Sequence, residues 1–171
     1  MHEHTKRICD FLTEIQLPFR FHEVEENTFL PGLKTVMGTL YIDNEKLRYP
    51  GDILHEAGHI AVCEPIFRGQ LHEDVYKNGL KNGREKQAMQ GEEMAAIAWS
   101  VAAIQYIGLP LEVVLHKDGY KGASASFVIA FREGNGFGYP LLSAWDMTCP
   151  KQGFPKMQKW IRELRWINEL S

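Results

Sequence analysis

Apolar residues recur at the helical spacing in several parts of the chain. In residues 5–16 they place Ile8, Phe11, Leu12 and Ile15 on one face, which predicts an amphipathic helix capped by Thr5 and closed before Pro18. The same periodicity predicts further helices over residues 53–63, 86–107, 123–133 and 155–170. Asp52 is the expected N-cap of the 53–63 helix.

Alternating apolar and polar residues predict strands early in the chain. The segments "FRFHEV" and "GTLYID" have this pattern, and "DNE" followed by "KLRY" reads as a turn and a further strand. Residues 111–116 fit a short helix or a strand, and residues 68–86, with "KNGLKNG", predict an exposed hairpin or loop. We therefore expect one α+β domain over residues 1–171, with a small antiparallel sheet and a mostly helical body.

Composition and charge exclude several classes of protein. The 171 residues are 44% hydrophobic and 24% charged, as in globular domains, and the net charge of −3 without a basic cluster excludes a nucleic-acid binder. Residues 94–111 contain no charge. Because this stretch is rich in alanine and includes Ser100, Gln105 and Pro110, we expect a buried helix and no membrane span.

The cysteines and the first residues bear on cellular location. Cys9, Cys63 and Cys149 are odd in number and widely spaced, which predicts neither a disulfide framework nor a thiolate zinc site. The opening "MHEHTKRICDFL" has scattered charges and no apolar core, so we expect no secretory signal. Both features favour a cytoplasmic protein.

The segment "ILHEAGHIAV", residues 53–62, places three polar side chains inside an apolar helix. His55 and His59 are four residues apart and lie on one face, so a nitrogen of each can bind one ion. Glu56 lies next to the pair and can reach a water molecule on that ion. This HExxH arrangement is typical of a hydrolytic zinc site; the alternative is a core histidine pair whose hydrogen bonds are satisfied.

Burial makes the metal hypothesis the stronger one. An unpaired carboxylate in an apolar interior destabilises the fold by several kcal/mol or takes up a proton. A metal with its bound water would satisfy all three groups. Gly58, which lowers helix stability by about 1 kcal/mol relative to alanine, indicates close approach by a neighbouring segment or by substrate.

A catalytic zinc needs a third protein ligand, and the 86–107 helix offers two candidates at "GEEMAAIAWSVAA". Glu93 shares a helical side with Ser100, whereas Glu92 shares one with Trp99. We favour Glu93, and we expect the other acid to complement the helix dipole. The remaining alternatives are His72, Glu73, Asp74 and His116.

"LHEAGH" followed by a glutamate at the head of a second helix resembles the zincin metallopeptidases, specifically the glutamate-ligand branch that includes thermolysin. The stretches "EEMAAIAWS", "LHKDGYKG" and "YPLLSAWDM" are also similar to small uncharacterised bacterial zincin-like proteins. The resemblance implies a zincin-like fold, zinc ligands His55, His59 and Glu93, and Glu56 as general base.

Two departures from that family concern the metal ligands. No third histidine follows His59, and Ile97 stands where the thermolysin group often has an aspartate four residues after the ligand glutamate. A partner that orients the histidines must therefore come from elsewhere in the chain or be water.

Residue groups outside the HExxH motif give weaker indications of function. His116 and Tyr120 could donate hydrogen bonds to an oxyanion, or could be ordinary loop residues. "GASAS" lacks the second glycine of a serine-hydrolase elbow, and "GNGFGYP" follows a helix, which predicts a loop. Cys63 and the tryptophans are expected in the core.

The sequence therefore predicts a Zn²⁺-dependent hydrolase that cleaves a peptide or protein substrate with metal-activated water. The alternative is a zinc-binding structural or regulatory module that cleaves nothing, with the "KNGLKNG" segment serving a partner. Two histidines and a carboxylate also suit iron or manganese. The sequence makes no prediction of oligomeric state.

Overall fold

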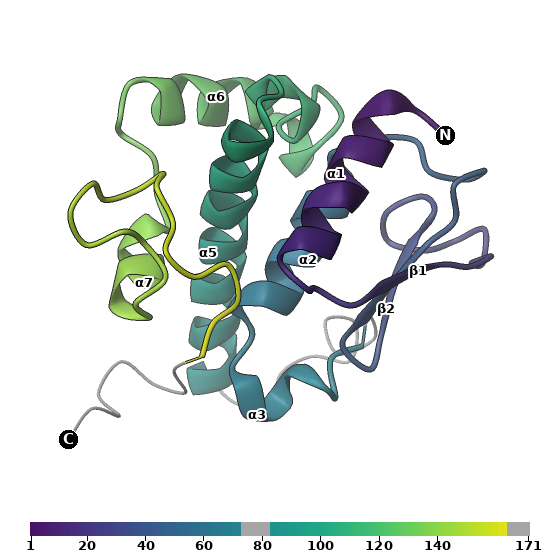
Figure 1. Ribbon diagram of the computed structural model, residues 1–171, viewed down its shortest axis with the longest axis horizontal. Coiled ribbons are helices and arrows are strands. Elements are labelled where there is room, and N and C mark those ends of the chain that lie inside the picture. Colours follow the sequence, from purple (N-terminus) through teal and green to yellow (C-terminus); the bar gives the residue numbers. More distant parts are fainter. Residues whose placement is uncertain (73–82, 164–171) are drawn as a thin grey trace.

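Helix α5 (Gly83–Ile107) runs through the middle of the molecule (Figure 1). The computed structural model describes residues 1–72 and 83–163, with side chains from residue 90 onward in the second range. On one side of α5 lie α1 (Glu3–Glu14), α2 (Asp52–Val62) and the sheet; on the other lie α6 (Ser124–Arg132) and α7 (Tyr139–Ala144) (Figure 1). The architecture is α+β, as predicted.

Four of the five helices predicted from the periodicity form, with shifted starts. Helix α1 begins earlier than expected, at a His2 cap whose ring accepts a hydrogen bond from the His4 amide, and Thr5 is buried within the helix instead of capping it. Helix α2 begins at Asp52, and its N-cap is Gly51, so the Asp52 side chain is not the predicted cap. The reason is that Asp52 accepts a hydrogen bond from a distant loop, described below.

The predicted small sheet is confirmed, but it is mixed and not entirely antiparallel. Strand β3 (Thr39–Ile42) lies between β1 (Phe19–Phe21), which runs parallel to it, and β2 (Leu33–Val36), which runs antiparallel. Met37 and Gly38 form the two-residue turn between β2 and β3. Both have positive φ, as the turns that suit the right-handed twist of a hairpin require. Methionine is not a usual residue for that turn, so the sequence did not reveal it.

Residues 46–49 do not form the predicted strand. The amides of Lys46 and Leu47 donate to the carbonyl of Asp43, and the Glu45 amide donates to the Asp43 carboxylate. These local bonds close a turn after β3, because aspartate competes well for nearby amides. The chain then reaches α2 directly.

The predicted helix over residues 155–170 is wrong for residues 155–163; residues 164–170 lie outside the described part of the chain. The amides of Gln158 and Lys159 donate to the carbonyl of Met147, and the amide of Arg162 donates to that of Ala61. Backbone donors that are used by distant carbonyls cannot form the i to i−4 bonds of a helix. In the described part of this segment, Trp160 instead packs against Phe11.

Four short helical segments complete the described fold: α3 (Pro65–Arg68), α7 and two 3-10 turns, the second of which is Tyr120–Gly122. Helix α3 follows α2 after the expected break at Glu64 and Pro65, and α7 was not predicted. Residues Leu111–Val113 form a 3-10 turn, which settles the ambiguous segment as helical. The "KNGLKNG" repeat lies outside the described residues. None of the helices in the described ranges is long and apolar enough to cross a membrane.

The core forms where α2 meets α5 and the sheet. Helix α2 makes its most extensive contacts with α5 and also contacts β2, β3 and α1. Its apolar residues, such as Ile53, Leu54 and Ile60, are almost completely buried. The motif helix is therefore enclosed on most sides, and its two histidines are buried, whereas Glu56 is only partly buried.

Candidate metal centre

The two motif histidines lie side by side within α2. Their rings are 4.8 Å apart and edge to face, as expected for residues four apart on one helical face. His55 is 9% exposed and His59 is 7% exposed. Each buried imidazole needs partners for its two nitrogens, because an unpaired polar group in the core destabilises the fold.

Glu93 of α5 supplies a carboxylate to both histidines. Its Oε2 lies 2.7 Å from His59 Nε2, and its Oε1 lies 3.7 Å from His55 Nε2. The Glu93 side chain is 43% exposed, so this side of the group opens toward solvent. The three residues, which we call the metal triad, each offer one ligand atom, and these atoms lie within 4.8 Å of one another.

Gly58 explains how α5 comes this close. A Cβ at Gly58 would lie 2.9 Å from the carbonyl oxygen of Ala96 and 3.3 Å from the Trp99 ring. The glycine therefore lets the two helix backbones approach, and Glu93 lies one turn before Ala96. The close packing expected from Gly58 is confirmed, and it is what brings the third ligand to the histidines.

The neighbouring Glu92 points elsewhere. Its carboxylate lies 3.8 Å from the Arg162 guanidinium, and burial raises the pKa of Glu92 although the Arg162 charge opposes that shift. Within the described part of the chain, the triad contains neither His72 nor His116. Glu73 and Asp74 lie outside the described residues.

Burial and charge give the two histidines different protonation properties. Burial, with a contribution from His59, lowers the pKa of His55 to about 3, so His55 is neutral at physiological pH. Burial opposes protonation of His59 as well, but the hydrogen bond and charge of Glu93 outweigh it and raise the pKa of His59. Burial alone would raise the pKa of Glu93, but the hydrogen bond and charge of His59 outweigh burial and lower it.

The donor set fits a zinc ion. Tetrahedral zinc with bonds of about 2.0–2.2 Å holds its ligand atoms about 3.3–3.6 Å apart. The separations of 2.7 and 3.7 Å from Glu93 to the two histidines lie on either side of that range. Small side-chain movements would therefore suffice, because the backbones of α2 and α5 already have the required spacing.

Glu56 lies next to the triad on α2 and is only partly buried. Burial opposes the raised pKa of His59, Glu93 is the main cause of it, and the negative charge of Glu56 adds to the effect of Glu93. A position beside the ligands but outside the triad is what a proton acceptor for water requires.

His116 and Tyr120 contact the motif helix from the loop that follows α5. The Tyr120 hydroxyl lies 2.9 Å from His55 Nδ1, and His116 Nε2 lies 2.7 Å from Asp52 Oδ1. Tyr49 stacks on the His116 ring at 3.9 Å, and its hydroxyl donates to Asp118. Both predicted oxyanion donors therefore bind side chains of α2, a use that sequence reasoning missed because loop contacts leave no periodic signal.

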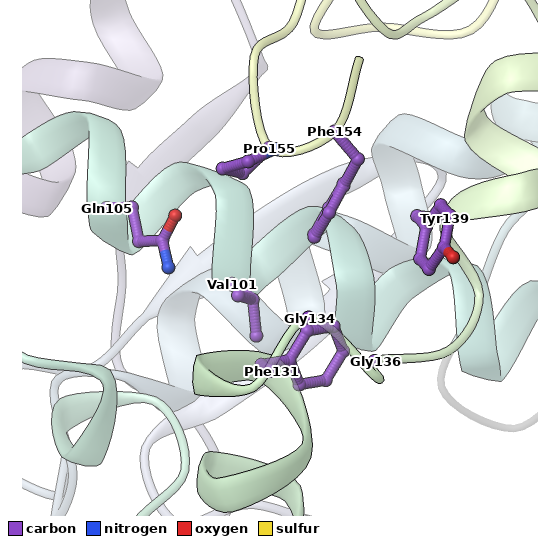
Figure 2. Close-up of a pocket in the computed structure, with 8 residues that line it drawn as sticks. All are labelled: Val101, Gln105, Phe131, Gly134, Gly136, Tyr139, Phe154 and Pro155. Carbon is purple, nitrogen blue, oxygen red and sulfur yellow. The ribbon is translucent and has the colours of Figure 1, made fainter.

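A separate pocket lies further along α5. Figure 2 shows the rings of Phe131, Tyr139 and Phe154 around it, with the Gln105 amide at one side. Its volume is about 240 Å³, and no residue that lines it belongs to the metal triad. Tyr139 stacks on Phe154 at 5.3 Å, so we attribute this pocket to the packing of aromatic side chains against α5.

Comparisons of the chain with protein-family models, curated proteins and solved structures gave no match. The function must therefore be inferred from the residues and their geometry.

Proposed function

We propose that this protein is a zinc-dependent hydrolase, a zincin-like metallopeptidase that cleaves a peptide or amide bond. The observation that supports it is the convergence of His55 and His59 of α2 with Glu93 of α5 within 4.8 Å, with Glu56 next to the histidines on α2. Two neutral imidazoles and one carboxylate leave a bound zinc with net positive charge, which favours hydrolytic chemistry.

The residues have separate roles in this proposal. His55, His59 and Glu93 hold the metal, which when bound lowers the pKa of a coordinated water toward about 7 and polarises the substrate carbonyl. Glu56 accepts a proton from the attacking water while the water oxygen forms a bond to the carbonyl carbon. Glu56 then donates that proton to the amine nitrogen as the carbon–nitrogen bond breaks.

Free thiols support a reducing compartment. Cys9, Cys63 and Cys149 are all free, and burial raises the pKa of Cys9 and of Cys63 to about 11, so these two remain protonated. We therefore propose a cytoplasmic location. The substrate of the proposed hydrolase is a peptide or protein.

The second candidate is a zinc-binding module that cleaves nothing. The burial of His55 and His59 favours it, because a closed site resembles a structural metal centre more than a catalytic one. The partly exposed Glu93 and Glu56 favour the hydrolase, since they leave one side of the triad open.

Metal analysis followed by one variant separates these candidates. Protein purified without a histidine tag should contain about one zinc per chain by elemental analysis. Glu56→Gln should retain that zinc. Its rate of hydrolysis of a fluorescence-quenched mixed-peptide library should be at least about a hundredfold lower than that of the wild type. Unchanged turnover in Glu56→Gln would overturn the assigned mechanism, and a zinc-loaded wild type without turnover would favour the module.

A further inference from the structure

The loop after α5 holds the motif helix at two points. His116 binds Asp52, and Tyr120 binds His55, at 2.7 and 2.9 Å. Asp52 and His55 are three residues apart and lie on the same side of α2. The loop therefore covers the part of α2 that presents the first metal ligand.

Tyr120 has an unfavourable backbone conformation. Tyr120 and the next residue, Lys121, both have φ of 52°, in the left-handed region that bulky side chains rarely adopt. Each such residue destabilises the fold by about 1 kcal/mol or more and persists only where its surroundings require it. This conformation places the Tyr120 ring edge-on to His55, with centroids 5.3 Å apart, and against Phe127 at 5.5 Å.

The contacts of the two His55 nitrogens define which atom donates: Nδ1 lies 2.9 Å from the Tyr120 hydroxyl, and Nε2 faces Glu93. A histidine that binds a metal ion through one nitrogen is neutral and carries its single N–H on the other. If Nε2 offers its lone pair on the side of Glu93, that proton resides on Nδ1 and is donated to the Tyr120 oxygen.

We propose that Tyr120 is a positioning residue of the metal centre, which holds His55 in the Nδ1–H tautomer and fixes the rotation of its ring. The His116–Asp52 pair secures the loop that carries Tyr120. Tyr120 thus performs the task that a carboxylate usually performs for a metal-binding histidine. The inference rests on the proposed zinc site and adds to it a residue that the motif does not contain.

The test compares zinc binding by the wild type, Tyr120→Phe and Tyr106→Phe, measured by competition with a chromogenic chelator. Tyr120→Phe keeps the ring and removes only the hydroxyl, so zinc affinity should fall about 10–100-fold. Tyr106→Phe is the matched control, because its hydroxyl bonds Glu14 at 2.6 Å on an exposed surface; its zinc affinity should equal the wild type's.

Two further readouts separate positioning from a structural role. Cobalt(II) bound to Tyr120→Phe should show a shifted visible absorption spectrum, whereas metal-free Tyr120→Phe should unfold at the wild-type temperature within a few degrees. A loss of metal-free stability that accounts for the whole affinity loss would overturn the positioning role.

The possible failures can be distinguished. Wild-type protein that binds no zinc overturns the metal centre and this inference with it. Zinc-loaded wild type with equal affinity in Tyr120→Phe overturns only the role of Tyr120. Should Tyr120→Phe fail to fold, His116→Phe decides, because it keeps the stacking on Tyr49 and removes the bond to Asp52. Affinity reduced at least about threefold supports the inference, and unchanged affinity overturns it.

Discussion

The middle and the C-terminal end of α2 both bury polar groups, but they do so in different ways. At the C-terminal end, donors meet acceptors: the Arg68 side chain donates to the carbonyls of Ile60 and Cys63 at 2.9 Å, and Arg162 Nη1 donates to that of Val62 at 3.1 Å. These cations satisfy the last carbonyls of the helix and complement its dipole. This end of α2 needs no further group.

In the middle of α2 the converging atoms are of one kind. The two Nε2 atoms of His55 and His59 and the carboxylate of Glu93 are all electron-pair donors to a cation. Without a metal, a proton shared between His59 and Glu93 partly satisfies them, as the raised pKa of His59 and the lowered pKa of Glu93 indicate. A set of like donors around one point is what the proposed metal site requires, and it distinguishes this region from the C-terminal end of α2.

The largest expected effect tests whether the middle of α2 binds metal at all. His59→Ala removes one of the three proposed ligands and should reduce zinc from about one per chain to a trace by elemental analysis. Wild-type protein should also unfold at a higher temperature with added zinc, because the metal binds only the folded state, and His59→Ala should lose that shift. Full zinc content in His59→Ala would contradict the proposed metal site in the middle of α2.

Two adjacent glutamates sharpen the comparison within α5. Glu93→Ala should weaken zinc binding by about a hundredfold or more in a chelator competition, because a charged ligand is lost. Glu92→Ala should leave zinc affinity within about threefold, because Glu92 lies against Arg162 outside the triad. The reverse order of effects would show that the ligand assignment is wrong.

Arg68→Met tests the C-terminal end of α2. It removes charged donors from four carbonyls and should lower the free energy of unfolding by about 2–3 kcal/mol in urea denaturation. The four carbonyls are those of Ile60, Ala61, Cys63 and Arg162. Zinc affinity should stay within about twofold.

The control for Arg68→Met is Arg132→Met. Arg132 forms an exposed ion pair with Glu112, and its replacement should change stability by less than about 1 kcal/mol. Comparable losses of stability in both variants would contradict the structural role of Arg68.

The smallest expected effect concerns Gly58, which lies between the two regions. Gly58→Ala should destabilise the protein by about 1–2 kcal/mol, because the new methyl group would contact the Ala96 carbonyl at 2.9 Å and outweigh the better helix propensity. Gly91→Ala, in α5, meets only the Leu141 side chain at 3.4 Å and should be neutral or stabilising by up to about 1 kcal/mol. Thermal unfolding of both variants measures the difference.

Local periodicity predicted most of the helices but not the strand pairing. Helix α2 was expected over residues 53–63 and spans Asp52–Val62, because the 3.6-residue repeat is contained within the segment itself. The parallel pairing of β1 with β3 joins residues about twenty positions apart, and no local pattern encodes it. Residues 155–161 show that a local pattern can also predict a helix that does not form. The amides of Gln158 and Lys159 donate to the distant carbonyl of Met147 and are not available for helical bonds.

The sequence by itself determined the donor atoms of the candidate site: the spacing of His55 and His59 places them on one face of any helix, and the helical wheel of α5 favoured Glu93 over Glu92. Tertiary structure alone decided that the two helices approach at Gly58 closely enough for Glu93 to reach both rings. It also decided that a loop tyrosine, Tyr120, contacts His55. The physical reason is that helical geometry repeats within a few residues, whereas the packing of separate segments depends on shape and burial across the whole chain.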